Sequence, residues 1–398
     1  MHKKVAITGM GIISAIGKNV EENFDSLIHQ KHGLSRLENF DSIHKNEIFV
    51  GEIKLSNDEL ATFLNLSPEN NFSRTVMLGL IAVKEALQNA GIENVNEVRT
   101  GLISSTSVGG MDRTENYFLD YENLLEKQKY ISSHDAGASS NQISNEIGLK
   151  GFVSTISTAC SSAANAIMYG ARLINSGKLD RVIVGGTDAL SKFTMNGFKS
   201  LMILSDEFNQ PFDENRKGLN LGEAAAYLVL ESEEFVRKSN KKVLGYLIGA
   251  GNSNDAFHQT ASSENGEGAY LAMRKAFESA IIQPTEIDYI NVHGTATNNN
   301  DLTEGRALKR IFGENVPNFS STKPFTGHTL AAAASVEAVF SLLSLQHNLV
   351  YPNLNFQSPI EELNIFPTTK LVKKNIKYVL SNSFGFGGNC STLIFSKS

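Results

Sequence analysis

Residues 151–177 read GFVSTISTACSSAANAIMYGARLINSG and place Cys160 where a β-prone run gives way to a helix of small residues that Gly177 closes. A strand that leads directly into a helix is the building unit of α/β folds. A thiol at such a helix start meets unpaired backbone N–H groups and the positive end of the helix dipole. We therefore expect the Cys160 pKa to be lowered toward the reactive thiolate. The alternative is a small buried side chain without chemistry.

The same alternation of short β-rich runs and helical segments covers the whole chain, which is typical of an α/β protein. Expected strands lie within residues 3–11, 100–106, 180–186, 241–255, 287–294 and 318–322, and expected helices within 73–91, 268–280, 301–313 and 330–346. The charged stretch 231–242 separates two such series. We expect residues 1–240 and 241–398 to form two halves, each with its own sheet; one irregular α/β domain is the alternative.

Composition excludes several classes of protein. The 398 residues include 36 basic and 42 acidic side chains, for a formal net charge of −6, whereas a nucleic-acid binder should be basic. Two cysteines do not make a disulfide framework, which favours reduced thiols and a cytoplasmic protein. Glycines interrupt the apolar N-terminal run, so we interpret it as strand and turn rather than an export signal. No run approaches ~20 apolar residues, and we expect no membrane span.

His293 follows an apolar strand in the segment IDYINVHGTAT. Open α/β sheets bind ligands beyond the carboxyl ends of their strands, so this position suits chemistry. Thr295 and Thr297 follow directly and can hydrogen-bond an amide-bearing substrate arm, or cap the turn. A structural histidine is the alternative for His293.

Lys323 and His328 flank a turn in SSTKPFTGHTLAAAASVEA, before an alanine-rich helix. We expect His328 in the first turn of that helix, where the dipole disfavours imidazolium and keeps the ring neutral. For Lys323, an exposed surface position is the alternative to a place in the site.

Phenylalanines alternate with glycines in SNSFGFGGNC near the C-terminus. Glycines allow unusual backbone conformations and close approach of a ligand, so this loop can gate a pocket through Phe384 and Phe386 and offer an N–H to an oxyanion. A hairpin with buried aromatic side chains is the alternative. The chain has no CxxC or HExxH spacing, so we expect no metal, and its glycine-rich turns match neither a dinucleotide fingerprint nor a P-loop.

Taken together, these segments resemble the elongating β-ketoacyl-acyl-carrier-protein synthases of the thiolase-like superfamily. The likeness runs nearly end to end, through VAITGMGIISAIG (5–17), TACSSA (158–163), PFDENRKGLNLGEAAAYLVLE (211–231), HGTAT (293–297), STKPFTGH (321–328) and NSFGFGG (382–388). The resemblance implies an α/β fold of two similar halves stacked as α-β-α-β-α layers, and a homodimer. It also implies an acyltransferase that forms carbon–carbon bonds.

The resemblance assigns roles that the chemistry makes reasonable. Cys160 takes an acyl group from the phosphopantetheine thiol of an acyl carrier protein and holds it as a thioester. Malonyl-acyl-carrier protein then loses carbon dioxide, while His293 and His328 hydrogen-bond the developing enolate oxygen. The enolate carbon attacks the acyl group, and the oxyanion sits on the N–H groups of Cys160 and Phe386. No cofactor beyond the carrier's own phosphopantetheine is implied.

Further side chains are implied as supports. Lys323 acts through electrostatics and orientation with Glu304 as its partner, and Thr295 and Thr297 hold the pantetheine arm. Three aromatic residues line or gate the acyl tunnel: Phe198, Phe384 and Phe386.

Two relatives differ at the site. Initiating synthases that are primed with acetyl-CoA use Cys-His-Asn, and thiolases use a second cysteine as base; His328 favours the decarboxylating, elongating type. Cys390, the other thiol, is expected to be structural. An alternative is an active subunit of a heterodimer with a non-catalytic chain-length factor. A subunit that is itself inactive is disfavoured because the chain retains all four site residues, Cys160, His293, Lys323 and His328.

Several positions differ from the usual fatty-acid pattern, among them NNND (298–301) after HGTAT and Asn389 and Cys390 after GFGG. HGTAT followed by Asn300 and Asp301, together with STKPFTGHTL (321–330), is similar to synthases of aryl-polyene and related pigment pathways, so a polyunsaturated or aryl-primed chain is an alternative to a saturated fatty acid. Arg74 and Lys199 are candidate docking residues for an acidic carrier protein, with plain surface solvation as the alternative.

Overall fold

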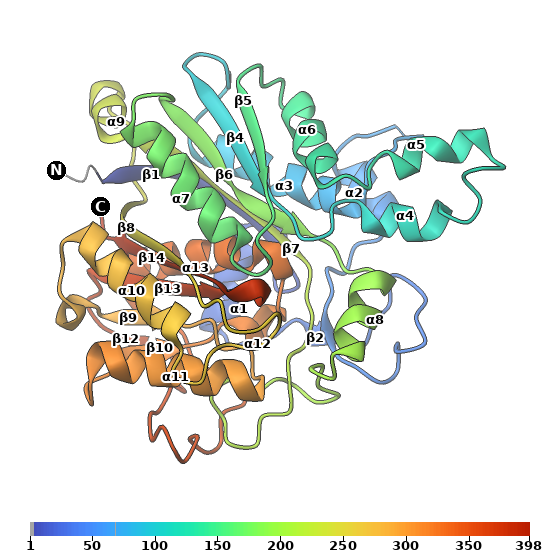
Figure 1. Cartoon of the computed structure of the whole chain (residues 1–398). Coiled ribbons are helices and arrows are strands. Elements are labelled where there is room, and N and C mark those ends of the chain that lie inside the picture. The colour runs from blue at the N-terminus through green and yellow to red at the C-terminus, as the bar shows by residue number, and fades with distance from the viewer. Residues whose placement is uncertain (1–3, 68) are drawn as a thin grey trace.

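The computed structural model describes residues 4–67 and 69–398 (Figure 1). The first half contains strands β1 (Val5–Ser14), β2 (Leu34–Ser35), β3 (Val50–Gly51), β4 (Thr100–Ser105), β5 (Phe152–Ile156), β6 (Arg181–Asp188) and β7 (Ala224–Ser232). Its α-helices are α1 (Val20–Ile28), α2 (Asn57–Phe63), α3 (Arg74–Asn89), α4 (Met111–Tyr117), α5 (Gln128–Ile131), α6 (Ala136–Glu146), α7 (Ser162–Asn175), α8 (Lys192–Ser200) and α9 (Glu233–Ser239).

The second half contains strands β8 (Gly245–Asn254), β9 (Tyr289–Asn291), β10 (Asn318–Ser320), β11 (Leu349–Val350), β12 (Val372–Lys373), β13 (Tyr378–Phe384) and β14 (Asn389–Ser396). Its α-helices are α10 (Glu267–Ala280), α11 (Asn298–Phe312), α12 (Lys323–Thr326) and α13 (Ala333–His347). Short 3-10 helices are η1 (Leu125–Lys127), η2 (Pro284–Glu286), η3 (Leu330–Ala332) and η4 (Phe386–Gly388).

Each half builds five strands of the same topology. The order is β5-β4-β6-β7-β1 in the first half and β10-β9-β13-β14-β8 in the second. In both halves the first three of these strands pair in parallel and the remaining pairs are antiparallel. The expectation of two separate sheets is wrong, because Val5, Ala6 and Ile7 of β1 pair with Leu247, Tyr246 and Gly245 of β8. These pairs join the halves into one ten-stranded sheet.

The helices complete five layers. α7 packs on β6 and β4, α13 packs on β13 and β7, and the two helices contact each other between the two halves of the sheet. α3 covers β1 and β7 on the outside of the first half, and α10 covers β8 and β14 on the outside of the second (Figure 1). The layers are therefore α-β-α-β-α, which confirms the fold class expected from the sequence.

The two outer helices pack by the same device. A Cβ on Gly11 of β1 would lie 2.2 Å from the Ala82 carbonyl oxygen of α3, and a Cβ on Gly251 of β8 would lie 2.1 Å from the Ala272 carbonyl oxygen of α10. Only glycine lets helix and strand backbones approach this closely. The repetition of this contact supports the reading of two similar halves.

The central helix layer is strongly apolar. The segment Leu330–His347 is long and apolar enough to cross a membrane by composition, yet 89% of it is buried inside the protein. It is therefore a core helix whose apolar surface is covered by the two halves of the sheet. Cys160 and His328, which precede the N-terminal ends of α7 and of this segment, line the same cavity.

Candidate active site

Cys160 lies in the turn between β5 and α7, one residue before the Ser161 cap. Ala159 has φ +52°, a left-handed conformation that a non-glycine residue rarely adopts, and it turns the following thiol toward the cavity. Ser162 Oγ accepts a hydrogen bond from Thr158 N at 2.8 Å and tightens this turn. The thiol is 6% exposed.

His293 lies two residues after β9, in a turn whose backbone is hydrogen-bonded to side chains of α11. Glu304 accepts hydrogen bonds from His293 N at 2.9 Å and from Gly294 N at 2.8 Å. Asp301 accepts from Thr295 N at 2.9 Å. Both carboxylates come from α11, so the helix presents acceptors to the N–H groups of the turn and fixes the imidazole above it.

His328 lies before η3 and α13, not in the first helical turn as the sequence suggested. Its backbone N donates to Asn220 O at 2.7 Å, and its carbonyl accepts from Gly222 N at 2.9 Å. Its ring Nδ1 accepts a hydrogen bond from Leu330 N at 3.1 Å. The imidazole itself therefore caps the start of η3, and the segment around Asn220 in the first half holds it in place.

Lys323 is buried in α12, 2% exposed, so the surface alternative is wrong. Its Nζ donates to the Glu337 carboxylate and the His293 carbonyl oxygen and lies 3.3 Å from His293 Nδ1. The prediction that Glu304 is the partner of Lys323 is wrong, because both Glu304 oxygens accept hydrogen bonds from backbone N–H groups of the turn at His293. The sequence does not indicate Glu337 as the partner, because Glu337 lies 14 residues after Lys323 in the middle of an apolar helix with no motif around it.

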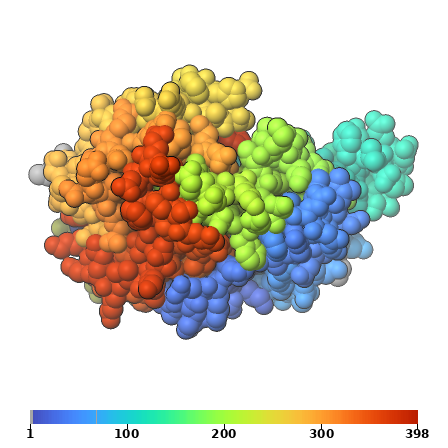
Figure 2. All heavy atoms as spheres, turned by 90° about the horizontal axis from the view of Figure 1, so that it is seen from below, coloured from blue at the N-terminus to red at the C-terminus, as the bar shows by residue number. Residues whose placement is uncertain are grey.

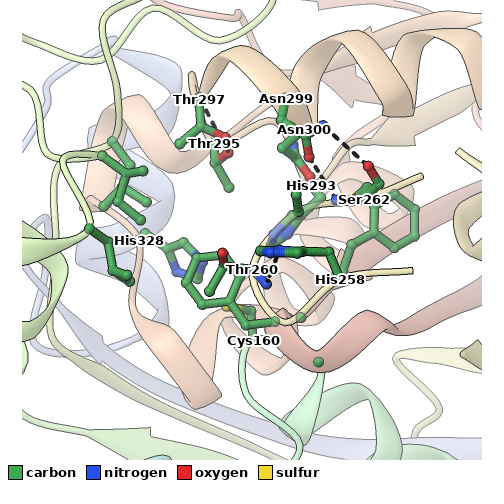
Figure 3. A pocket seen from close by; sticks show the side chains of 18 of the residues that line it. Cys160, His258, Thr260, Ser262, His293, Thr295, Thr297, Asn299, Asn300 and His328 are labelled. Atoms are coloured by element: carbon green, nitrogen blue, oxygen red, sulfur yellow. Dashed lines mark hydrogen bonds between the residues drawn. The ribbon is translucent and has the colours of Figure 1, made fainter. Parts of the chain in front are cut away.

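These elements bring the thiol and the two imidazoles together (Figure 3). The Cys160 sulfur and one nitrogen from each of His293 and His328 all lie within 4.8 Å of one another. The two imidazole rings are 5.4 Å apart and nearly perpendicular, at 86°. Three residues far apart in the sequence thus converge on one point, as the sequence predicts.

Both imidazoles are neutral hydrogen-bond donors in this arrangement. Burial, and after it the Lys323 charge, holds the pKa of His293 and of His328 well below the usual value. In each ring Nδ1 faces a donor, the ammonium of Lys323 or the N–H of Leu330, so the proton resides on Nε2. Protonated Nε2 atoms beside a buried cation suit stabilisation of negative charge on a substrate and do not suit metal ligation.

The expected lowering of the Cys160 pKa is wrong for the free protein. Burial raises the thiol pKa to about 11, although Lys323 and the N–H groups of Phe386 and Cys160 itself oppose the rise. Desolvation of the anion outweighs these contacts. The same two N–H groups converge at the sulfur and form a candidate oxyanion hole.

A cavity of about 290 Å³ leads to Cys160 past His293, His328, Thr295 and Thr297. Its polar rim includes Asn299 of the NNND segment, and also His258 and Thr260, which no motif marks in the sequence (Figure 3).

A second cavity of about 480 Å³ lies against Cys160 on the side of α8. Phe198 and Phe386 line both cavities, with ring centroids 6.0 Å apart and planes 21° from parallel. Phe384 lines the first cavity and packs 5.8 Å from the His293 ring. The expected aromatic residues therefore lie around the thiol.

Of the two predicted docking residues, the structure contradicts the prediction for Arg74. It is 5% exposed, and its guanidinium forms a two-point ion pair with Glu223. A buried, paired arginine cannot meet a partner protein. Lys199 has a 40% exposed side chain 3.5 Å from Glu47 and stays a prediction. Cys390 is buried against α10 in the second half, as expected of a structural residue.

The site has the features of a thiol acyltransferase. A buried thiol lies beside two neutral imidazoles and a paired lysine, and two N–H groups converge on its sulfur where two cavities meet. Comparison with known proteins narrows the class. The chain belongs to the β-ketoacyl synthase family: the family model of the N-terminal domain matches residues 2–235 and that of the C-terminal domain matches residues 244–357.

Named relatives agree with this family. The chain is 33% identical to 3-oxoacyl-[acyl-carrier-protein] synthase 2 of Vibrio harveyi, over 99% of both chains. It is 32% identical to the synthase of the same name from Staphylococcus aureus (strain COL), over 100% of this chain and 99% of the relative.

Among solved structures, the ishigamide ketosynthase/chain length factor covers 100% of both chains, with a TM-score of 0.93 and 27% identity. A ketosynthase in complex with its chain length factor, from Xenorhabdus doucetiae, has a TM-score of 0.87 and 31% identity, and the match covers 100% of this chain and 98% of that one.

Proposed function

We propose that this chain is a β-ketoacyl-acyl-carrier-protein synthase that holds an acyl chain on Cys160 and extends it by decarboxylative condensation with malonyl-acyl-carrier protein. The observation that carries the proposal is the pair of neutral Nε2–H donors beside a buried thiol. The chain needs no resident cofactor in this scheme, because the carrier protein brings its own phosphopantetheine.

The first step is acyl transfer. The Cys160 sulfur attacks the carbonyl carbon of the acyl thioester, and the oxyanion accepts hydrogen bonds from the N–H groups of Cys160 and Phe386. The carbon–sulfur bond to the carrier breaks, and the leaving pantetheine thiolate takes the proton that the Cys160 thiol loses. Lys323 favours the thiolate during this exchange, since its charge opposes the effect of burial on the thiol pKa.

The second step forms the carbon–carbon bond. The malonyl carboxylate leaves as carbon dioxide, and its electron pair forms an enolate whose oxygen accepts hydrogen bonds from Nε2 of His293 and of His328. The enolate carbon attacks the acyl carbonyl on Cys160, and the cysteine thiolate leaves. Lys323 orients His293 through Nδ1 and balances Glu337, while Glu304 holds the backbone turn beneath the ring.

The cavities suit the two parts of the substrate. The polar-rimmed cavity with Thr295 and Thr297 suits the pantetheine arm, which carries amides, and the cavity beside α8 suits the acyl chain. Phe384, Phe198 and Phe386 line or gate these spaces. An acyl carrier protein is the partner that delivers both substrates, and Lys199 is a candidate contact for its acidic surface.

We further propose a dimer in the cytoplasm, built from two copies or from this chain and a chain-length factor. The segment from α4 to α5 projects from the body and exposes Phe118, Leu119 and Leu125 at 56%, 87% and 77% (Figures 1 and 2). The strand β5 ends the sheet and exposes Phe152 at 40%. Exposed apolar side chains and an open strand edge each favour a protein partner.

Two structural neighbours bear on the choice between the two partners, because their names describe ketosynthases with chain length factors. Size-exclusion chromatography with light scattering decides it. A stable, active dimer of this chain alone supports the homodimer, and activity only after co-expression with a paralogue that lacks the cysteine supports the heterodimer.

The proposed chemistry is tested with two variants of the same residue. Cys160→Ala should abolish acylation by acyl-carrier protein, whereas Cys160→Gln should retain release of carbon dioxide from malonyl-carrier protein, since decarboxylation needs the histidines and not the thiol. Acylation of the Cys160→Ala protein at the wild-type rate would overturn the assignment of the nucleophile. The absence of carbon dioxide release from wild type and Cys160→Gln alike would overturn the decarboxylating function.

A further inference from the structure

A cluster of side-chain amides lies behind Cys160, between α7 of the first half and strands β8 and β14 of the second. Its centre is Asn389, whose Oδ1 lies 2.9 Å from Asn165 Nδ2, 2.9 Å from Asn252 Nδ2 and 2.7 Å from Ser161 Oγ. Ser391 Oγ donates to Asn165 Oδ1 at 2.8 Å. The cluster therefore ties the helix that follows the nucleophile to both strands of the other half.

The donors around Asn389 fix the orientation of its amide. Asn165 Nδ2 carries two hydrogens, one for Asn389 Oδ1 and one for Thr158 Oγ1 at 2.9 Å. Asn252 Nδ2 also faces Ser391 Oγ at 2.9 Å. An amide turned the other way would point its own hydrogens at those of Asn165 and Asn252. The side-chain oxygen Oδ1 of Asn389 thus accepts hydrogen bonds from both halves of the protein.

Asn389 also closes the loop that carries Phe386. Gly385 N donates to Asn389 O at 2.8 Å, so residues 385–389 form a short loop with a pinned base. The loop packs directly on the nucleophile's turn: a Cβ on Gly385 would lie 2.9 Å from Thr158 O and 3.1 Å from Cys160 N. The position of the Phe386 N–H relative to Cys160 therefore depends on how this base sits on α7.

We propose that Asn389 is a positioning residue that aligns the two donors of the oxyanion hole, the N–H groups of Cys160 and Phe386, by binding the base of the 385–389 loop to α7. The inference rests on the proposed function. It predicts a selective defect, because the enolate donors His293 and His328 belong to other turns and have no bond to this cluster among the contacts of the described residues.

The test separates acyl transfer from decarboxylation. In Asn389→Ala, the single-turnover rate of Cys160 acylation, followed by intact-protein mass spectrometry, should fall about 10- to 100-fold, as expected when one oxyanion donor is misplaced. The rate of carbon dioxide release from malonyl-carrier protein, measured in the Cys160→Gln background with and without Asn389→Ala, should change by less than about threefold. The ratio of the two rates is the readout.

Ser391→Ala is the matched control. It removes a buried polar group from the same strand and the same cluster, but both amide donors to Asn389 Oδ1 stay in place. It should lower the melting temperature by an amount similar to Asn389→Ala and leave the ratio of rates within about threefold of wild type.

Three results would overturn the inference. These are an acylation rate in Asn389→Ala equal to wild type, an equal fall of acylation and decarboxylation, and an equal change of the ratio in Ser391→Ala. If wild type and Cys160→Gln release no carbon dioxide, the proposed function fails instead, and the acylation rate of Asn389→Ala still decides the role of Asn389 in the transfer step.

Discussion

Removal of the Lys323 charge tests the buried ion pair beneath the site. Lys323 and Glu337 are each 2% exposed, and their side chains pair directly. Lys323→Met leaves the carboxylate without its cation, and breaking a buried pair from one side costs about 3–5 kcal/mol. With an unfolding entropy of about 2.1 cal/mol/K per residue over 398 residues, this corresponds to a fall in melting temperature of about 4–6 °C.

The pH dependence of this variant has a defined sign. Burial already raises the Glu337 pKa, and Lys323 opposes the rise. Without Lys323 the folded pKa rises further above the unfolded value, so the folded state binds a proton that the unfolded state releases. Stability of Lys323→Met should therefore be greatest below the unfolded pKa and fall as pH rises through the folded pKa, more steeply than in wild type.

Differential scanning calorimetry of the single and double variants provides the assay. The double variant Lys323→Met/Glu337→Met removes both charges and should recover most of the lost melting temperature, while malonyl decarboxylation stays impaired in both because His293 loses the donor to its Nδ1. A melting temperature of Lys323→Met equal to wild type would refute the pairing. Full activity of the double variant would refute the role of Lys323 in orienting His293.

Three further predictions concern the site. His293→Ala and His328→Ala should each lower the decarboxylation rate about 10²- to 10³-fold, and retention of half the rate by either variant would contradict that donor's role. Alkylation of Cys160 by iodoacetamide should accelerate roughly tenfold per pH unit from pH 7 to 10, since the thiol pKa is about 11; a plateau by pH 8 would contradict the effect of burial, and Cys160→Ala controls for labelling of Cys390. Burial raises the Glu304 pKa to about 7, so its contribution of about 3 kcal/mol is present below about pH 4.5 and lost as pH rises through 7. Chemical denaturation at pH 5 and at pH 8 should show that raising the pH lowers the free energy of unfolding less in Glu304→Gln than in wild type. A loss equal to that of wild type would contradict the assignment.

Much of the fold was predictable because strands and helices alternate with clear boundaries. The helix expected over 73–91 is α3, capped by Ser73 and followed by Gly91 at φ +64°. The separate sheets were not predictable, because the β1–β8 pairs involve residues about 240 positions apart in the chain. Local patterns do not report which strand edges meet.

In the site, too, local motifs were predictable from the sequence and contacts between distant segments were not. Cys160, His293 and His328 were found because each stands at a strand end or helix start within a distinctive motif. Glu337 carries no such mark, since only the fold turns its helix toward Lys323. Burial reversed two expectations, the Cys160 pKa and the exposure of Arg74, because the depth of a side chain depends on packing from distant segments.

In the proposed reaction Cys160 carries the chain while malonyl decarboxylation supplies the attacking carbon. The most direct measurement is mass spectrometry of the Cys160 peptide after incubation with acyl-carrier protein, before and after addition of malonyl-carrier protein. We expect one acyl group on Cys160, which disappears as a β-ketoacyl-carrier protein and one carbon dioxide per chain appear. An unmodified Cys160 peptide, or an acyl group that stays in place while carbon dioxide is released, would contradict it.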